Sequence, residues 1–217
     1  MIKMLWLNIL MWIGIIFLIF MVFIFGILRL IRHFYKFPIP AFATRLIDNP
    51  IRRKIVQPPE VLVKRMQLNP GMKVLEIGPG KGSYTKAVAE NIEPDGIVYA
   101  TDIQDSVINS LKKRIEKWNI KNIIPKVDEA YNLSFKNETF DRIFAIACLP
   151  EIPEPIKALK EFKRVLKSDG LVCLSELFPD PDYPLRRTEI KWAKEAGLEL
   201  SEKFGNWFVY QLNFRKK

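Results

Sequence analysis

The sequence predicts an α/β protein: a doubly wound, mostly parallel seven-stranded sheet with a C-terminal antiparallel hairpin, preceded by one transmembrane helix. Three observations support this prediction. Residues 5–28 carry no charged side chain. From residue 58 onward, short apolar runs alternate with amphipathic segments, which is typical of a parallel sheet covered on both faces. The last two runs, within residues 198–214, meet at Gly205 and Asn206, a pair that favours a hairpin turn.

The uncharged segment is long enough to span a bilayer. At 1.5 Å per residue it extends over ~36 Å, more than the ~30 Å hydrocarbon core. It is too long for the apolar region of a signal peptide, and four basic or histidine residues separate it from the Ala-Phe-Ala at 41–43. A soluble core helix is rarely apolar on every face for this length. We therefore expect a membrane span.

Charge sets the expected orientation of this span. Only Lys3 and the amino terminus precede it, whereas residues 29–65 carry nine Lys or Arg against two acidic residues. The positive-inside bias predicts a single-pass protein with its C-terminal domain in the cytoplasm. The basic excess next to the membrane favours lipid headgroups over nucleic acid as its counterpart, although setting the topology explains it equally well.

Three regions follow from this pattern: a transmembrane helix with its basic flank (1–36), a juxtamembrane linker along the membrane surface (37–57) and an α/β domain (58–217). In the domain we expect strands at 73–78, 96–102, 122–130, 140–149 and 170–177, then two more within 198–214. Helices are expected at 60–68, 83–91, 104–118, 155–167 and 186–197. Ser83 is the expected cap of the second of these helices.

The histidine and cysteine content excludes several kinds of catalytic and metal site. His33 is the only histidine, and it lies beside the predicted span, so no His-based triad or His-rich metal site is available to the domain. We expect no metal. Cys148 and Cys173 lie in apolar runs and are expected to be buried strand thiols in a reducing compartment. The sequence leaves the oligomeric state open.

A glycine-rich turn follows the first predicted strand. Ligands of such sheets bind beyond the carboxyl ends of the strands, and Gly78, Gly80 and Gly82 allow close approach of the backbone. The G-x-G-x-G spacing differs from the G-x-G-x-x-G/A fingerprint of dinucleotide sites. Glu76 places a carboxylate in an apolar strand, which is costly unless a partner compensates it. A cationic ligand group would be such a partner.

Acidic residues also end the next two predicted strands. Asp102 could accept hydrogen bonds from both hydroxyls of a ribose, as is equally expected of NAD enzymes. Asp128 and Glu129 end the third strand, where a carboxylate could accept from an adenine amino group. A helix cap or a plain surface acid is the competing interpretation of Asp128.

The ordered set of motifs, Glu76 to Gly82, Asp102, Asp128 and the "RVLKSDG" before the fifth strand, resembles class I S-adenosylmethionine-dependent methyltransferases, with a Rossmann-like fold, over residues 58–214. The resemblance implies that Glu76 and the loop glycines face the methionine moiety, Asp102 the ribose and Asp128 the adenine, with Ile103 packed on the adenine ring. The cofactor site that it implies comprises Glu76, Gly78, Pro79, Gly80, Gly82, Tyr84, Asp102, Ile103, Asp128, Glu129 and Ala147.

Methyl transfer needs alignment more than a strong acid or base, but a carbon or oxygen acceptor must still lose its proton. Without a histidine, the candidates are acidic or phenolic, and the predicted catalytic residues are Glu176, Tyr183 and Glu151. Residues 176–184 leave the fifth strand at the ligand-binding end and could form a lid over the acceptor or be an ordinary loop. The segment after the fourth strand lacks the Asn/Asp-Pro-Pro-aromatic motif of enzymes that methylate base amino groups.

The sequence therefore predicts a membrane-anchored S-adenosylmethionine-dependent methyltransferase that acts on a lipid or another membrane-associated acceptor. Its expected partners are the bilayer and that acceptor, with nucleic acid disfavoured. An NAD-dependent oxidoreductase and a catalytically silent membrane-tethered module are the alternatives. The glycine spacing and the terminal hairpin argue against the first, and the intact Glu76, glycine loop and Asp102 argue against the second.

Overall fold

The computed structural model describes residues 2–35, 50–178 and 180–217. The chain divides into two compact units, Met1–Phe37 and Pro38–Lys217. The first unit is the helix α1 (Ile2–Phe34), in which Asn8–Arg32 is long and apolar enough to cross a membrane. These criteria are length and composition, and a signal sequence near an N-terminus meets them too. Residues 37–49 of the predicted linker lie outside the described residues.

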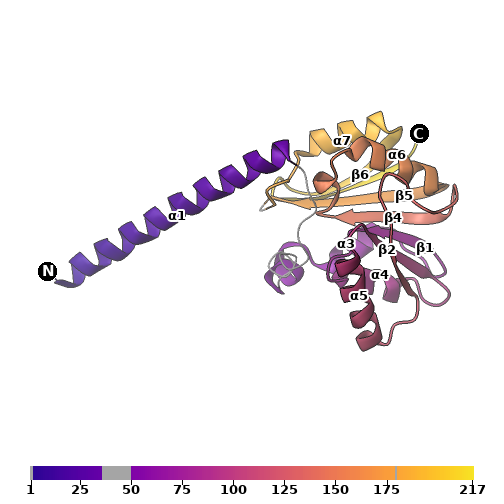
Figure 1. The fold of residues 1–217 in the computed structure, drawn as a ribbon, viewed down its shortest axis with the longest axis horizontal. Helices are drawn as coiled ribbons and strands as arrows, with labels where there is room; N and C mark the ends of the chain where they lie inside the picture. Colours follow the sequence, from indigo (N-terminus) through magenta and orange to yellow (C-terminus); the bar gives the residue numbers. More distant parts are fainter. Residues whose placement is uncertain (1, 36–49, 179) are drawn as a thin grey trace. The chain divides into compact units, whose positions relative to one another are not determined.

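The second unit is built on a seven-stranded sheet in the order β3-β2-β1-β4-β5-β7-β6 (Figure 1). Its strands are β1 (Lys73–Ile77), β2 (Ile97–Asp102), β3 (Ile123–Val127), β4 (Phe140–Ile146), β5 (Leu166–Leu177), β6 (Leu198–Gly205) and β7 (Val209–Lys216). The first five run parallel, and β7 pairs antiparallel with both β5 and β6. The predicted fold class is thereby confirmed.

Helices cover both faces of the sheet (Figure 1). On one face lie α3 (Pro59–Arg65), α4 (Ser83–Asn91) and α5 (Asp105–Trp118), and on the other lie α6 (Pro155–Val165) and α7 (Arg186–Glu195). Each face has its own buried apolar cluster, centred on Val74, Val88 and Leu111 on the first and on Leu75, Phe162 and Ala193 on the second. Alternate residues of β1 thus serve opposite layers, which fixes the register of this central strand.

Several local predictions were wrong. Ser83 does not cap α4: the capping position is Gly82, at φ +75°, and Ser83 is the first helical residue. The strand β3 ends at Val127, so residues 128–130, predicted as its polar end, belong to the irregular connection that precedes β4. The strand β5 starts at Leu166, earlier than predicted, because this buried leucine pairs with Phe140 across a register shift in β4. Cys173 is a buried thiol in β5, but Cys148 lies beyond the end of β4.

The end of the predicted linker is also folded. Pro50 and Ile51 are helical, and the short π-helix η1 (Arg52–Val56) follows them. Within this segment Arg52 and Gln57 are buried. We call residues 50–57 the neck, because they directly precede the α/β domain and contact its cavity through Arg52.

Candidate functional site

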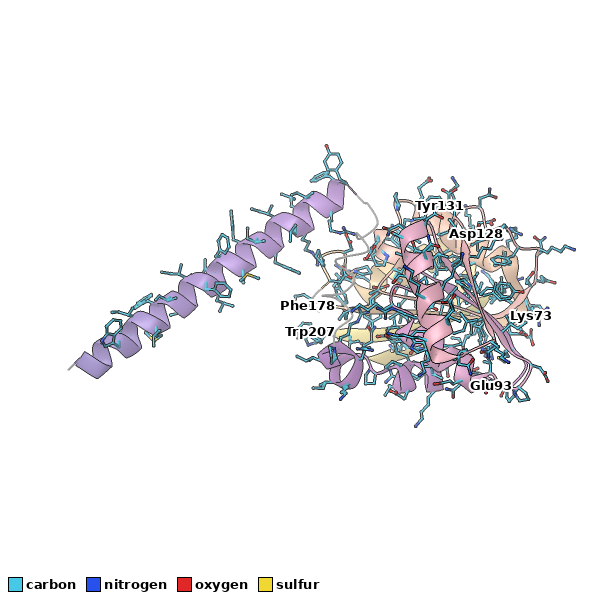
Figure 2. The ribbon with its side chains drawn as sticks, turned by 60° about the horizontal axis from the view of Figure 1, so that its bottom comes forward. Lys73, Glu93, Asp128, Tyr131, Phe178 and Trp207 are labelled. Atoms are coloured by element: carbon cyan, nitrogen blue, oxygen red, sulfur yellow. The ribbon has the colours of Figure 1, made fainter. Side chains whose placement is uncertain are left out.

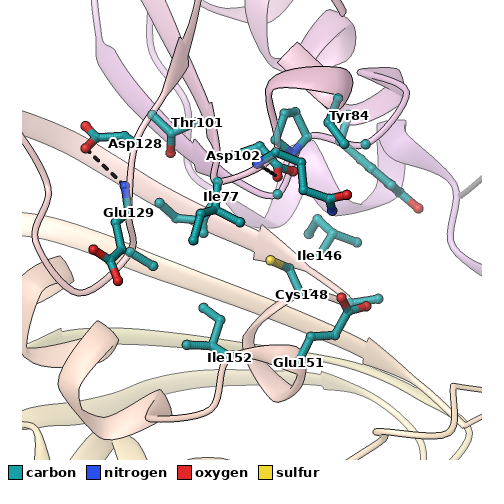
Figure 3. A pocket seen from close by; sticks show the side chains of 18 of the residues that line it. Ile77, Tyr84, Thr101, Asp102, Asp128, Glu129, Ile146, Cys148, Glu151 and Ile152 are labelled. Carbon is teal, nitrogen blue, oxygen red and sulfur yellow. Dashed lines mark hydrogen bonds between the residues drawn. The ribbon is translucent and has the colours of Figure 1, made fainter. Parts of the chain in front are cut away.

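A cavity lies beyond the carboxyl ends of β1, β2 and β4 (Figure 3). The strand order reverses here, because β1 has β2 on one side and β4 on the other, so this is the usual ligand position in a doubly wound sheet. Asp128 and Glu129 lie at one end of the cavity, and Cys148 and Glu151 lie at the other. The apolar side chains of its wall are Ile77, Ile103, Val107, Ile146, Ile152 and Pro153.

The glycine loop forms part of the wall, and its conformation needs glycine. Gly78, Gly80 and Gly82 have φ values of +71°, +52° and +75°. The Gly78 amide donates to the Thr101 carbonyl oxygen (2.9 Å), which joins the loop to the end of β2. A Cβ added at Gly78 would lie 2.3 Å from the Cys148 sulfur, whereas one at Gly80 would meet nothing within 4 Å. The loop is therefore close-packed at Gly78 and open at Gly80.

Glu76 lies behind this loop. It is buried, it is not in the cavity wall, and it accepts a hydrogen bond from the Thr85 hydroxyl of α4. Burial raises its pKa to about 8, against the lowering effect of the Thr85 hydrogen bond, and the charge of Asp102 raises it further. At neutral pH the carboxyl is mostly protonated. A cation in the cavity would favour its ionised form.

Asp102 ends β2 in the cavity wall. One carboxylate oxygen accepts from the Gln104 amide (2.9 Å), and burial raises the pKa of this carboxyl while hydrogen bonds from the Gln104 and Ile103 amides lower it. Ile103, the next residue, exposes 56% of its surface, and its apolar side chain lines the cavity. A carboxylate that can accept hydrogen bonds from two ribose hydroxyls, next to an apolar side chain that can cover a base, suits a nucleoside.

Asp128 lies in the wall but serves its own loop. Its Oδ2 accepts from the Ser134 amide (3.1 Å) and hydroxyl (2.5 Å), and its Oδ1 accepts from the Glu129 amide (3.1 Å). Lys126 Nζ lies 3.6 Å from Oδ2. The carboxylate thus stabilises its own loop, where no helix begins, and Glu129 and Ala130 of this loop also line the wall.

Of the three predicted catalytic residues, only one lines the cavity. Glu151, in the short 3₁₀ helix η2 (Leu149–Glu151), lines the cavity. Glu176 is fully buried outside the wall, where burial and the charges of Glu189 and Asp180 hold its pKa well above the usual range. Tyr183 is buried as well, and its hydroxyl donates to the Trp207 carbonyl oxygen.

The structure therefore divides the predicted site residues into two groups. The cavity wall contains Gly78, Pro79, Gly80, Tyr84, Asp102, Ile103, Asp128, Glu129, Ala147 and Glu151. Outside it lie Glu76, Gly82, Glu176 and Tyr183. A Cβ at Gly82 would meet Leu111 (2.4 Å), so this glycine packs against α5 and not against a ligand.

Sequence reasoning missed several wall residues, of which Arg52 is the most informative. Its guanidinium donates through Nε (3.0 Å) and Nη2 (2.8 Å) to Gln57 Oε1. The cluster of basic residues at 52–54 was a signal, but it was interpreted only as a membrane flank. Cys148, Lys81 and Tyr131 also line the cavity, although Cys148 was expected only as a buried strand thiol and Lys81 only as part of the glycine motif.

Charge and shape together favour a cationic nucleoside ligand. The acidic wall residues Asp102, Asp128, Glu129 and Glu151 outnumber the basic ones, Arg52 and Lys81. Ala147 is held at φ +50°, an unfavourable conformation for a residue with a Cβ, as is found at binding sites. Among the described residues, no group of three or more His, Cys, Asp or Glu side chains could hold a metal ion.

Comparison with known proteins agrees with this geometry. Residues 75–174 match the family model of a methyltransferase domain. The chain is 35% identical over 115 residues to a ubiquinone/menaquinone biosynthesis C-methyltransferase from Bordetella avium, covering 52% of this chain and 44% of that protein. It is 31% identical to a demethylmenaquinone methyltransferase from a Geobacillus species, covering 55% and 52%. The chain thus spans about half the length of these relatives.

The chain is also similar to a methyltransferase that acts on another class of substrate and to a solved structure. A tRNA (adenine(58)-N(1))-methyltransferase catalytic subunit from Yarrowia lipolytica is 30% identical, over 54% of this chain and 31% of that protein. The crystal structure of an S-adenosylmethionine-dependent methyltransferase from Aquifex aeolicus superposes with a TM-score of 0.76 at 23% identity, covering 82% of this chain and 98% of that one. The latter shows a shared fold.

Proposed function

We propose that this chain, whose residues 75–174 match a methyltransferase domain, is a class I S-adenosylmethionine-dependent methyltransferase that transfers a methyl group to a lipid-soluble acceptor at a membrane surface. The observation that carries the proposal is the cavity, in which the glycine loop, Asp102 and Ile103 meet at the strand ends of β1 and β2. Bound there, S-adenosylmethionine would supply an electrophilic methyl group.

The wall residues fit the parts of this cofactor. The backbone at Gly78 and Gly80 would hold the methionine end, Asp102 would accept from the ribose hydroxyls, and Ile103 would cover the base. Glu76, behind the loop, would supply negative charge that favours the sulfonium. A carbon acceptor must also lose a proton, and Glu151 is the carboxylate in the wall that could accept it.

The nature of the acceptor is inferred from two supports. The quinone methyltransferases among the relatives are named for lipid-soluble ring substrates. In addition, α1 contains a segment with the length and composition of a membrane span, and tethering raises the effective concentration of a membrane-embedded substrate. We infer a demethylated isoprenoid quinol as the acceptor, with the catalytic domain on the cytoplasmic face, as the flanking charges predict.

The test uses the full chain in lipid nanodiscs with methyl-labelled S-adenosylmethionine. The acceptors offered in parallel are a demethylmenaquinol, a total lipid extract and total RNA. We expect label in the organic phase on the quinol, and loss of this label in Asp102→Ala. Label on RNA alone, or binding of S-adenosylhomocysteine without any transfer, would refute the proposal, and the second result would support a silent module.

A further inference from the structure

The neck is fixed to the domain by a buried chain of hydrogen bonds. Arg52 donates to Gln57 Oε1, Gln57 Nε2 donates to Ser175 Oγ (2.7 Å), and Ser175 Oγ donates to the Tyr210 carbonyl oxygen (2.7 Å). The Tyr84 hydroxyl donates to the Gln57 carbonyl oxygen (3.0 Å). The neck is therefore held against both β5 and α4, and its orientation on the domain is defined.

This orientation turns two large apolar side chains outward. Arg52 faces the cavity and is 7% exposed, whereas Ile51 and Ile55 are 67% and 76% exposed. Residues four apart lie on the same side of a helix, so the two isoleucines share one outward face. Lys54, between them in sequence, is exposed as well.

A second apolar pair lies beyond the carboxyl end of β5, the strand to which Gln57 of the neck is bonded through Ser175. Phe178 follows β5 and Trp207 lies in the β6–β7 turn, with their ring centroids 5.5 Å apart and exposed fractions of 40% and 70%. Figure 2 shows the two beside each other, at the end opposite Lys73 and Glu93. Backbone hydrogen bonds hold both residues in place. The Phe178 amide donates to the Phe208 carbonyl oxygen (2.7 Å), and the Tyr183 hydroxyl donates to the Trp207 carbonyl oxygen.

The four side chains Ile51, Ile55, Phe178 and Trp207 form what we call the apolar rim. Exposed apolar groups of this size mark interaction surfaces. Tryptophan is enriched at membrane interfaces, and basic residues beside apolar ones favour anionic lipid. Of the three basic residues in 50–57, Arg52 faces the cavity, so the cations available to a lipid surface are the exposed Lys54 and the half-buried Arg53, and this segment has no acidic residue. Because Arg52 of the same segment lines the cavity, the neck part of the rim lies next to the cavity.

We propose that the apolar rim docks on the surface of an anionic lipid bilayer and holds the cavity against the membrane, as a contact separate from α1. The proposal rests on the proposed function for its purpose, since such docking would allow a lipid acceptor to enter without crossing water. It does not depend on that function for its test, which measures lipid contact directly.

The test compares the full wild-type chain with Trp207→Phe in nanodiscs of phosphatidylcholine and phosphatidylglycerol, with and without bromine on the upper acyl chain. The tryptophan fluorescence that differs between the two proteins belongs to Trp207. We expect bromolipid to quench at least half of it, and to quench less in pure phosphatidylcholine. If the difference signal is unquenched and stays that of a water-exposed indole, the proposal is overturned, whether the rim is free or binds a protein.

A second measurement uses Ile55→Asp, with Ile124→Asp as the matched control on the exposed side of β3, where Ile124 is 40% exposed. We expect Ile55→Asp to abolish most of the Trp207 quenching and the control to retain it. Both should bind S-adenosylhomocysteine as the wild type does, which verifies folding. Quenching without lipid methylation would sink the proposed function alone, whereas methylation without quenching would sink the docking alone.

Discussion

At the scale of single residues, the glycine loop is most constrained at Gly78. We predict that Gly78→Ala weakens S-adenosylhomocysteine binding more than tenfold. The alanine would have to adopt φ +71°, and its Cβ would lie 2.3 Å from the Cys148 sulfur. Gly80→Ala is the comparison, since its Cβ would meet no protein atom within 4 Å, so that in the free protein only the backbone conformation, worth about 1–2 kcal/mol, is penalised. Calorimetric titration measures both.

A second-site change separates the two causes. Cys148→Ala removes the sulfur and should recover part of the affinity lost in Gly78→Ala, to about the level of Gly80→Ala. Close packing at Gly78 would be contradicted if Gly78→Ala and Gly80→Ala lost the same affinity. It would also be contradicted if the double-mutant cycle showed no coupling between positions 78 and 148.

The residues also show what a sequence can and cannot reveal about a site. Asp102 was predictable because a carboxylate at the end of the second strand points to one edge of the sheet. Glu176 was assigned to catalysis on the same ground, but its side chain turns under α7 beside Glu189. Strand order and residue type fix the end at which a residue lies, whereas the direction of its side chain depends on tertiary packing.

At the scale of elements, the neck is the main departure from expectation. Its prolines and basic residues predicted a linker, because a short helix has no strong periodic signal and derives its stability from tertiary contacts. The decisive contacts run from Gln57 to Ser175, which lies 118 residues later in the chain. No local pattern in the sequence could reveal that pairing.

Gln57→Ala tests this anchoring. The substitution leaves the Arg52 guanidinium and the Ser175 hydroxyl without their Gln57 side-chain bonds, and loss of a buried polar partner costs about 1–3 kcal/mol. We expect the midpoint of urea unfolding in mild detergent to fall accordingly. Gln57→Glu retains the acceptor for Arg52 and should lose less. An unchanged midpoint in Gln57→Ala would show that the neck is not anchored through this side chain.

At the scale of the whole molecule, the sequence predicted the layers and the strand count because apolar runs and amphipathic helices alternate regularly from residue 58 onward. It predicted a carboxylate in the apolar first strand, but not that two further carboxyls, in the fifth strand and in a helix, are buried as well. Glu76, Glu176 and Glu189 are all buried, in β1, β5 and α7. Each was visible as an isolated acid, but burial depends on the assembled fold.

These carboxyls predict how stability depends on pH. Burial raises the pKa of Glu76 and of Glu189 to about 8, and that of Glu176 lies well above its usual value. Between about pH 4.5 and 8, the unfolded chain releases protons that the folded domain retains, so the free energy of unfolding falls as pH rises. Each group contributes up to about 1.4 kcal/mol per pH unit. Stability from these groups is fully present below pH 4.5.

A carboxylate with a lowered pKa, Glu161, has the opposite effect and reduces the free energy of unfolding at low pH. Glu161 pairs with Arg164 at 2.8 Å, which lowers its pKa, so its contribution is lost as pH falls through that lowered value. We therefore expect urea unfolding to show maximal stability near pH 5 and a decline toward pH 8. Glu189→Gln should flatten this decline, because the amide keeps the shape and cannot ionise. A stability that rises toward pH 8, or an unchanged slope in the variant, would contradict burial of these carboxyls as protonated groups.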